Sequence, residues 1–283
     1  MANDASRNVV AGDGAIAENS SKPVVLITGC AKGGIGFEYC KAFSELGCHV
    51  VATDVPDRVA ELAADLESAD TLPLDVTSDE SVASAVGRVM AAHGRIDVLV
   101  NNAGIGCTGP LAELRGEAVR RAMDVNFLGQ VRTVHMAAAR AGRVVNVGSV
   151  VGNAAPYCAS KATDALRLEL RPFGVHVVKV VPGAVRSGLG RANAAHLTGQ
   201  DQWRMYRDFA AAIEERARAS QSGKATDAGA FARVVARRVL SKRPPREIVY
   251  GHMTLLFAAL AVSPAWVRDA FFTRRFGLHK TIN

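Results

Sequence analysis

The stretch VVLITGCAKGGIG, residues 24–36, decides the fold. Its first half is a continuous apolar run closed by a glycine, which is typical of a strand buried on both faces. Its second half is rich in glycine and opens a helix predicted from Ile35 to Leu46. Gly29 permits the turn, while Gly34 and Gly36 let the backbone and the helix N-terminus approach a pyrophosphate. This order predicts a dinucleotide-binding strand–loop–helix unit.

Strand and helix patterns alternate along the chain after this unit. Further strands are predicted in HVVATD, which ends at Asp54, at Thr71 to Leu74, at Ile96 to Val100, in RVVNVGS, and in VHVVKVV, which ends at Pro182. Helices are predicted between them, including Glu117 to Arg140 and Cys158 to Leu170. The repeated order predicts an α/β fold, with a doubly wound parallel sheet (a Rossmann fold) and helices on both faces.

After Gly183 the pattern changes to helices with apolar stripes. One stripe consists of Trp203, Tyr206, Ala210 and Ile213; a second helix, from Thr226 to Leu240, buries Phe231, Val234, Val235 and Val239; EIVYG is a candidate last strand. Such stripes pack on a core or roof a substrate cleft. We expect a disordered leader at 1–22, a dinucleotide-binding domain at 23–190, and a C-terminal helical substrate lid at 191–283. The last part adds a strand and a hydrophobic tail to the same domain.

Composition narrows the classes of partner. The net charge of +7 is spread along the chain without a basic stripe that alternates with aromatic residues. We therefore expect no nucleic-acid partner, and a phosphate-bearing or membrane-surface partner instead. The 5 cysteines form no CxxC motif and no even framework, which indicates reduced intracellular thiols. The 7 histidines show no ligand-like pair, so no metal site is predicted.

The segment SVVGNAAPYCASK, from Ser149 to Lys161, carries the most chemistry. Tyr157 and Lys161 are spaced i, i+4, so on a helix both side chains leave the same face. An ammonium held beside a phenol favours the phenolate and makes the phenol a usable acid near neutral pH. Carbonyl reduction needs such an acid when a cofactor supplies hydride. YxxxK alone is usually an ordinary surface pair, and it gains weight only from the rest of the chain.

Two positions give opposite indications of which dinucleotide binds. Asp54 closes the second strand, where a carboxylate accepts hydrogen bonds from the ribose hydroxyls and repels a 2′-phosphate, which weakly favours NAD(H). Lys32 lies in the glycine-rich loop and can meet a 2′-phosphate, with Arg58 as a second cation, which favours NADP(H). The choice between the two cofactors stays open.

Two further groups follow predicted strands. Asp75 comes after the third strand, where its carboxylate can accept the adenine amino group. Asn101, Asn102, Ala103 and Gly104 end the fourth strand. They lie at the carboxyl edge, where open α/β sheets bind their ligands.

These motifs together resemble the short-chain dehydrogenase/reductase family over residues 23 to about 190. The ordered set is TGCAKGGIG, the Asp75 position, NNAG, Asn126 in MDVNFLG, Ser149, YxxxK at 157–161 and PGAVRS at 182–187. Within the family, the doubled glycine, RVVNVGSVVG, LRLELRPFGV and the tail KATDAGAFARVVARRVLSKRPPREIVYGHM resemble the branch of NADPH-dependent 1-acyldihydroxyacetone phosphate reductases. Plant short-chain reductases carry similar tails.

The resemblance implies roles for individual residues. Tyr157 would donate a proton to the substrate carbonyl oxygen, with Lys161 supporting the phenol and holding the nicotinamide ribose. Ser149 would hydrogen-bond the developing oxyanion, and Asn126 would position a water. The implied cofactor-binding residues are Thr28, Gly29, Lys32, Gly34, Ile35, Gly36, Asp54, Asp75, Val76, Asn102, Ala103, Gly104, Tyr157, Lys161, Pro182, Gly183, Val185 and Ser187.

The implied reaction transfers hydride from NADP(H) or NAD(H) to a lipid-like ketone, with 1-acyldihydroxyacetone phosphate reduced to lysophosphatidic acid as the first candidate. Arg186 and Arg191 are candidates to meet its phosphate. One alternative is a hydroxysteroid dehydrogenase, because the same catalytic residues occur with different substrate pockets. The other is a catalytically impaired nucleotide-binding regulatory protein. The resemblance also implies an intracellular location, either cytoplasmic or peripheral on the endoplasmic reticulum or lipid droplets.

Three segments look short against the family. Ser149 precedes Tyr157 by 8 positions, which is about five fewer than usual. The stretch from Asn126 to Ser149 and the helix beyond Lys161 also look shorter, by about one and a half helical turns each. The loop normally walls the substrate cleft and the helices normally build a dimer interface. We therefore expect impaired reductase activity and leave a homodimer open.

The segment from Ile248 to Val267 contains no charged residue. Its length would permit a membrane span, but IVYG is expected to form the last strand and Pro264 interrupts the helix. Two expectations remain, a buried helix and an apolar lid at a membrane face. The cations that follow, Arg268, Arg274, Arg275 and Lys280, suit anionic headgroups.

Overall fold

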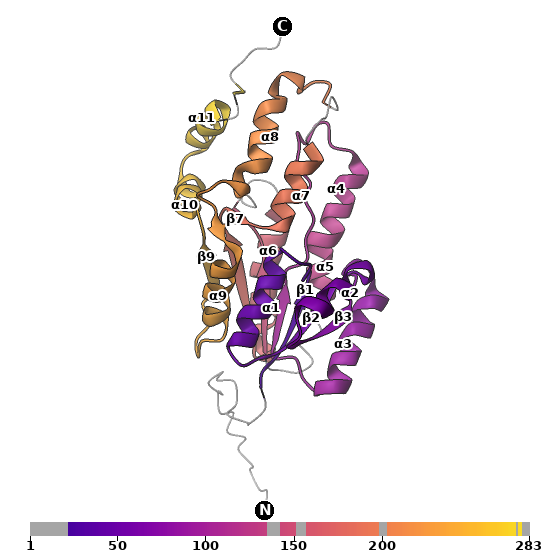
Figure 1. The fold of residues 1–283 in the computed structure, drawn as a ribbon. Helices are drawn as coiled ribbons and strands as arrows, with labels where there is room; N and C mark the ends of the chain where they lie inside the picture. The colour runs from indigo at the N-terminus through magenta and orange to yellow at the C-terminus, as the bar shows by residue number, and fades with distance from the viewer. Residues whose placement is uncertain (1–21, 135–141, 151–156, 198–202, 276, 279–283) are drawn as a thin grey trace, which may run out of the picture.

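The structure is a computed structural model that describes residues 22–134, 142–150, 157–197, 203–275 and 277–278 (Figure 1). Its centre is a seven-stranded sheet in the order β3-β2-β1-β4-β5-β6-β9, and every strand pairing is parallel. The strands are β1 (Val24–Thr28), β2 (His49–Asp54), β3 (Ala69–Pro73), β4 (Val98–Asn101), β5 (Gly142–Val147), β6 (Val175–Pro182) and β9 (Glu247–Tyr250). The predicted doubly wound parallel sheet is confirmed. The strand order reverses between β1 and β4, where such sheets bind their ligands.

Helices cover both faces of the sheet (Figure 1). They are α1 (Ile35–Glu45), α2 (Pro56–Asp65), α3 (Asp79–His93), α4 (Gly116–Met123), α5 (Gly129–Arg132), α6 (Tyr157–Glu169), α7 (Gly188–Leu197), α8 (Ala210–Arg218), α9 (Ala228–Val239), α10 (Thr254–Val262) and α11 (Ala265–Arg275). Short turns η1 (Asp124–Leu128) and η6 (Ala219–Gln221) and the strand pair β7 (Val185–Arg186) and β8 (Thr226–Asp227) complete the fold.

The run VVLIT is buried at all five positions because each face of β1 has its own core. Val25 and Ile27 belong to the cluster that α1 and α9 cover. Val24 and Leu26 face the opposite cluster, to which α3 contributes Val89. Side chains alternate across a strand, so the apolar residues 24–27 supply both cores, while the buried Thr28 at the end of the strand forms hydrogen bonds.

The long helix predicted from Glu117 to Arg140 is interrupted. The chain forms α4, then the π-helical turn η1, then α5, which ends at Arg132; residues 135–141 lie outside the described part. A π-helical turn inserts an extra residue into the helix and often marks a functional site. Here it contains Asn126.

The predicted helical stripe that starts at Trp203 is wrong in one respect. Trp203 and Tyr206 precede α8, although they pack with Ala210 and Ile213 in one small cluster. The Glu113 carboxylate accepts the backbone N–H groups of Arg204 (2.8 Å) and Met205. These bonds hold the segment as a turn before the helix begins.

The C-terminal part adds β9 to β6 as predicted, and then forms α10 and α11. Ser263 and Pro264 separate the two helices, and among the described residues no helix is both long and apolar enough to span a membrane. The expectation of a buried helix is wrong for α10, because Leu255 is 86% and Val262 is 87% exposed. Nearly all of the predicted leader, 1–22, lies outside the described residues.

Candidate active site

The glycine-rich loop and the end of β4 are held together by reciprocal hydrogen bonds. Thr28 Oγ1 accepts from the backbone N–H groups of Asn102 and Ala103, both at 3.1 Å. The Asn102 amide donates to the carbonyl oxygens of Thr28 at 3.0 Å and Gly29 at 2.9 Å. Four of the predicted cofactor-binding residues therefore lie at one point of the sheet edge, beside the reversal between β1 and β4.

Gly29 and Gly36 are glycines because no side chain fits at these positions. Gly29 has a φ of +71°, and a Cβ there would lie 2.6 Å from Ala103 Cα. A Cβ on Gly36 would lie 2.2 Å from the Gly29 carbonyl oxygen. The loop thus lies against the start of α1, whose N-terminal N–H groups make an anion site. This cradle fits the pyrophosphate of a dinucleotide.

Asp54 organises this loop from the end of β2. Its carboxylate accepts the backbone N–H of Ala31 at 2.7 Å and that of Val55 at 2.9 Å, and the residue is only 8% exposed. These two N–H donors hold the carboxylate in one orientation. The negative charge expected to repel a 2′-phosphate is therefore fixed beside the loop.

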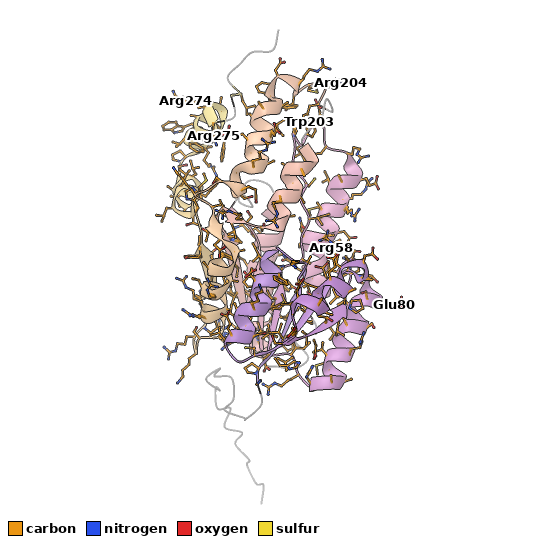
Figure 2. All side chains as sticks on the ribbon, viewed as in Figure 1. Arg58, Glu80, Trp203, Arg204, Arg274 and Arg275 are labelled. Carbon is orange, nitrogen blue, oxygen red and sulfur yellow. The ribbon has the colours of Figure 1, made fainter. Side chains whose placement is uncertain are left out.

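Lys32, the residue that favours NADP(H), forms an ion pair with Asp65 at the end of α2, with an Nζ–Oδ1 distance of 2.9 Å. Its side chain is 65% exposed, so solvent screens this pair and a ligand phosphate can compete for the ammonium. Arg58 lies exposed on α2 (Figure 2). The structure therefore does not decide between the cofactors. The carboxylate of Asp54 favours NAD(H), and the cations of the loop and α2 favour NADP(H).

Asp75 and Val76 shape the third loop. Asp75 Oδ1 accepts the backbone N–H of Thr77 at 2.9 Å and its hydroxyl at 2.7 Å. The backbone N–H of Asp75 donates to Ser81 Oγ at 2.9 Å, which ties the loop to the first turn of α3. Val76 is buried against Gly129 at the start of α5. Asp75 thus holds its own loop in addition to any contact with adenine.

The implied catalytic residues come from three elements. Asn126 lies in η1, Ser149 follows β5 and is half-buried, and α6 begins at Tyr157 and presents an exposed Lys161 one turn later. The helical spacing of Tyr157 and Lys161 is therefore confirmed. The 151–156 segment and the side chain of Tyr157 lie outside the described residues, so the shortened loop stays a prediction.

A buried polar chain fixes the position of α6. Asn101 Nδ2 donates to Asn146 Oδ1 at 2.8 Å, and Asn146 Nδ2 donates to Thr163 Oγ1 at 3.0 Å. Thr133 Oγ1 donates to Asn101 Oδ1 at 2.6 Å. All four residues are buried. Because unpaired polar groups are costly in a core, this chain defines one alignment of β4, β5 and the helix that carries Tyr157 and Lys161.

The PGAVRS segment leads α7 across the glycine loop. Pro182 ends β6, the Gly183 N–H donates to the Tyr250 carbonyl at 2.9 Å, Val185 lies in β7, and Ser187 is buried. The Gly188 N–H then donates to the Gly33 carbonyl at 2.7 Å. These contacts hold α7 against the loop.

One cation on α7 lies directly over the loop. Arg191 Nη2 is 2.6 Å from where a Cβ on Gly33 would be. The sequence suggested Arg191 for a substrate phosphate, and the structure also places it where it can meet the cofactor pyrophosphate. The position of Arg191 over the glycine-rich loop depends on how the PGAVRS segment folds. Residue spacing in the sequence does not show it.

A pocket of about 760 Å³ opens beside α7. It is lined by Arg191, Arg218, Arg275, Glu215, Gln221 and His252, among others. Arg275 pairs with Glu215 at 2.7 Å, and Arg218 pairs with Glu214 at 2.5 Å. Three guanidinium groups against one lining carboxylate make the pocket cationic. Of these arginines, only Arg191 is predicted from the sequence to bind a phosphate of the substrate.

Two of the described histidines lie close together in the fold although they are far apart in the sequence. His49 and His93, 44 positions apart in the sequence, meet at Asp70. Their spacing resembles no metal-ligand motif, which is why sequence patterns do not show the cluster.

Comparison with known proteins agrees with this geometry. Residues 23–198 match the family described as short chain dehydrogenase. The short-chain dehydrogenase ptmH of Penicillium ochrochloron is 32% identical over 278 residues, which cover 90% of this chain and 98% of the relative. An NADPH-dependent 1-acyldihydroxyacetone phosphate reductase of Schizosaccharomyces pombe is 40% identical over 181 residues, 58% of this chain and 60% of the relative. A short-chain dehydrogenase structure from Streptomyces avermitilis has a TM-score of 0.73 at 23% identity, and the match covers 90% of this chain and 96% of that one.

The chain therefore belongs to the short-chain dehydrogenase family. It is an NAD(P)-dependent oxidoreductase, as the ordered motifs predicted.

Proposed function

We propose that this oxidoreductase reduces the ketone of a phosphorylated lipid, with 1-acyldihydroxyacetone phosphate, reduced to lysophosphatidic acid, as the best candidate. One observation carries the proposal: the three-arginine pocket lies directly beside the exposed apolar helix α10. His252 and Met253 line the pocket, and α10 begins at the next residue. A substrate with an anionic head and an acyl tail matches this arrangement.

The pocket chemistry suits a phosphate. Guanidinium groups bind phosphate oxygens through charge-assisted, often bidentate hydrogen bonds. Arg218 and Arg275 are more than a third exposed and paired with Glu214 and Glu215, so a dianionic phosphate can compete for them. The name of the Schizosaccharomyces pombe relative supports the same substrate class.

Apolar surface near the pocket suits an acyl chain. Leu255, Val262 and Trp266 are 86%, 87% and 71% exposed on α10 and α11. A separate cavity of about 140 Å³ lies between the 108–110 loop and α8, with Tyr206, Phe209 and Ile213 in its wall. Burying apolar surface contributes about 25 cal/mol per Å², so both surfaces favour a lipid over a small sugar ketone.

In the proposed reaction, the cofactor and each catalytic residue have separate roles. The bound nicotinamide supplies the hydride. Tyr157 donates a proton to the carbonyl oxygen, with Lys161 one helical turn away to stabilise the phenolate that remains. Ser149 hydrogen-bonds the same oxygen as negative charge develops on it. The buried polar chain that ends at Thr163 holds α6 in one position, and α6 carries Tyr157 and Lys161.

Purified protein should oxidise NADPH or NADH in the presence of 1-acyldihydroxyacetone phosphate. Arg218→Gln and Arg275→Gln should each raise KM for this ketone at least about tenfold while kcat changes little, because they bind the phosphate and not the reacting carbonyl group. Arg237→Gln, on the exposed side of α9, is the matched control and should leave KM unchanged. High salt should raise KM for the wild type.

Three outcomes would contradict the proposal. Turnover of steroid ketones that ignores both arginine variants would identify a hydroxysteroid dehydrogenase. If Tyr157→Phe left ketone-dependent cofactor oxidation unchanged, the enzymatic assignment of this residue would fail. A protein that binds dinucleotide but turns over no ketone would support the impaired regulatory alternative.

We also propose that α10 and α11 dock on a membrane face, peripheral to the endoplasmic reticulum or lipid droplets. Arg274 lies on α11 (Figure 2), the helix that also carries the exposed Trp266. A basic edge next to an apolar face fits an anionic membrane surface. The triple variant Leu255→Ser, Val262→Ser and Trp266→Ser should lose co-flotation with anionic liposomes. Equal flotation of variant and wild type, or self-association in place of flotation, would reject docking.

A further inference from the structure

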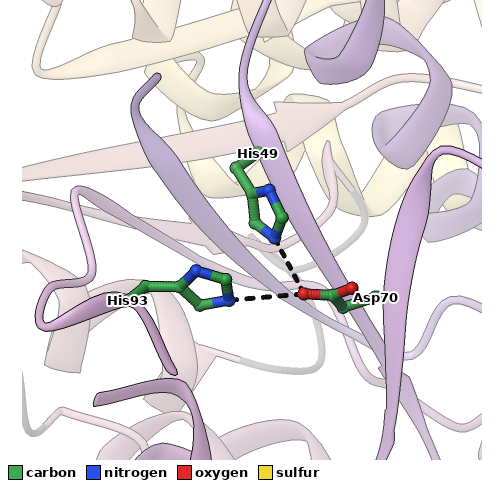
Figure 3. A group of neighbouring side chains, drawn as sticks. All are labelled: His49, Asp70 and His93. Atoms are coloured by element: carbon green, nitrogen blue, oxygen red, sulfur yellow. Dashed lines mark hydrogen bonds and ion pairs between the residues drawn. The ribbon is translucent and has the colours of Figure 1, made fainter. Parts of the chain in front are cut away.

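Two imidazoles converge on one carboxylate at the amino-terminal edge of the sheet (Figure 3). His49 Nε2 lies 2.8 Å from Asp70 Oδ2, and His93 Nε2 lies 3.3 Å from the same oxygen. The two rings are 4.3 Å apart between centroids. The three candidate ligand atoms all lie within 4.8 Å of one another.

The backbone brings these side chains together. β2 and β3 pair in register, with Val51 opposite Asp70, and His49 is two residues before Val51. Side chains two apart on a strand share a face, so His49 and Asp70 point to the same side of the sheet. That face is the one on which α3 packs through Val89. His93 is the last residue of α3, and the left-handed Gly94 ends the helix there.

The two distances to the Asp70 oxygen are close to those between the ligands of a tetrahedral metal ion. Zinc binds histidine nitrogen and carboxylate oxygen at about 2.0–2.2 Å, which places tetrahedral ligand atoms about 3.3 Å apart. The 3.3 Å distance from His93 to Asp70 already matches, and the 2.8 Å distance from His49 has to widen by about half an ångström. Exposed fractions of 35% for His49, 54% for Asp70 and 20% for His93 leave one side open to water.

We propose that His49, Asp70 and His93 bind one zinc ion, with water as the fourth ligand. Two imidazoles and one carboxylate favour a borderline metal such as zinc over magnesium or calcium, which prefer oxygen ligands. The site is separate from the dinucleotide loop, because β2 runs from His49 to Asp54 and places the two about 17 Å apart. Zinc links β2, β3 and α3, so it stabilises the folded chain by mass action.

The test uses the full chain without a histidine tag, stripped with a chelator and titrated with zinc chloride by calorimetry. We expect one zinc per chain and a higher melting temperature with zinc. His93→Gln and Asp70→Asn should each weaken zinc binding more than about 100-fold. Removing a residue that only hydrogen-bonds a metal ligand costs less than this. Both variants should melt like the wild type in chelator, which shows that they fold.

Two controls separate this site from other zinc ligands. His176→Gln removes an exposed histidine from β6 and should keep full affinity, as should Cys107→Ser, which removes a partly exposed thiol. Zinc binding that survives in both ligand variants overturns the proposal. So does a wild-type chain with no saturable binding at about 100 μM zinc, because it would gain no stability at cellular metal levels.

Discussion

Asn126 holds the backbone of Ile105 with both ends of its side-chain amide. Its Oδ1 accepts the Ile105 N–H at 2.9 Å, and its Nδ2 donates to the Ile105 carbonyl at 3.0 Å. The π-helical turn η1 positions the amide for this pairing. The segment after NNAG is thereby fixed to the helix layer, so Asn126 has a structural role whether or not it also positions a water.

Asn126→Ala should lower the free energy of unfolding by about 1–3 kcal/mol, because two backbone groups of Ile105 lose their partners. It should also lower kcat, since the loop after Gly104 borders the site. Urea unfolding and steady-state kinetics measure the two effects. Asn126→Asp keeps the acceptor for the N–H and should lose less stability than the alanine variant. Equal losses in both variants would contradict the two-bond account.

Thr163→Val should loosen α6. The change keeps the shape of the side chain but removes the oxygen that accepts from Asn146, so we expect a loss of about 1–3 kcal/mol in unfolding free energy. Because the same helix carries Tyr157 and Lys161, kcat should fall. KM for the dinucleotide should change by a smaller factor. Leu168→Ala, at an exposed position of α6, is the control and should change neither by much. A KM effect without a kcat effect would reject the positioning role.

The sheet and the dinucleotide loop could be predicted from the sequence because their patterns are local. The apolar run at 24–27 needs two covered faces. The glycines of the loop are required by close contacts within a few residues or with the segment after β4. Asp54 at the end of β2 and NNAG at the end of β4 follow from the same logic, since the carboxyl ends of parallel strands share one edge.

The contacts that the sequence did not show join residues far apart in the chain. His49, Asp70 and His93 meet only because β2 and β3 align in one particular register and α3 ends beside them. Arg218 and Arg275 reach one pocket because two separate helices end there. Helix continuity failed as a prediction at η1, where one extra residue breaks the period without any Pro or Gly signal inside Asp124–Leu128.

Asp54→Asn should shift the cofactor preference toward NADPH. The amide oxygen still accepts a backbone N–H of the loop, while the charge that repels a 2′-phosphate disappears. The ratio of kcat/KM for NADPH to that for NADH should rise about tenfold, the equivalent of about 1.4 kcal/mol. Asp57→Asn, at an exposed position of α2, controls for a general change of charge. An unchanged ratio would show that Lys32 and its neighbours set the preference.

Alkaline pH should destabilise the fold through Cys48. Burial, with a contribution from the Asp97 carboxylate, raises the pKa of Cys48 to about 11. An unfolded thiol ionises near pH 8.5. Between these values the unfolded state loses a proton that the folded state keeps, so stability is complete below about pH 8.5 and falls as the pH rises toward 11.

The predicted loss for this single thiol is about 2–3 kcal/mol between pH 8.5 and 11. Urea unfolding at a series of pH values measures it. Cys48→Ala should show a shallower decline than the wild type over the same interval. Parallel curves for the two proteins would assign the alkaline loss to other groups.

Tyr39→Phe should stabilise the protein. Tyr39 lies on α1 with no exposed surface, and its ring lies between Phe43 and Phe231, with centroid distances of 6.4 and 6.3 Å. Its hydroxyl is buried and has no hydrogen-bond partner among the residues that the structure describes. Burial correspondingly raises the pKa of Tyr39 well above that of a solvated phenol.

Removing an unpaired buried hydroxyl recovers its desolvation cost, so the free energy of unfolding should rise by about 1–3 kcal/mol in Tyr39→Phe. Tyr39→Leu separates the hydroxyl from the ring, because it removes both and should destabilise through lost aromatic packing. Thermal and urea unfolding of the three proteins give the comparison. If Tyr39→Phe were less stable than the wild type, the hydroxyl would have a partner in the folded chain. The contact between α1 and α9 would then depend on a polar bond as well as on apolar packing.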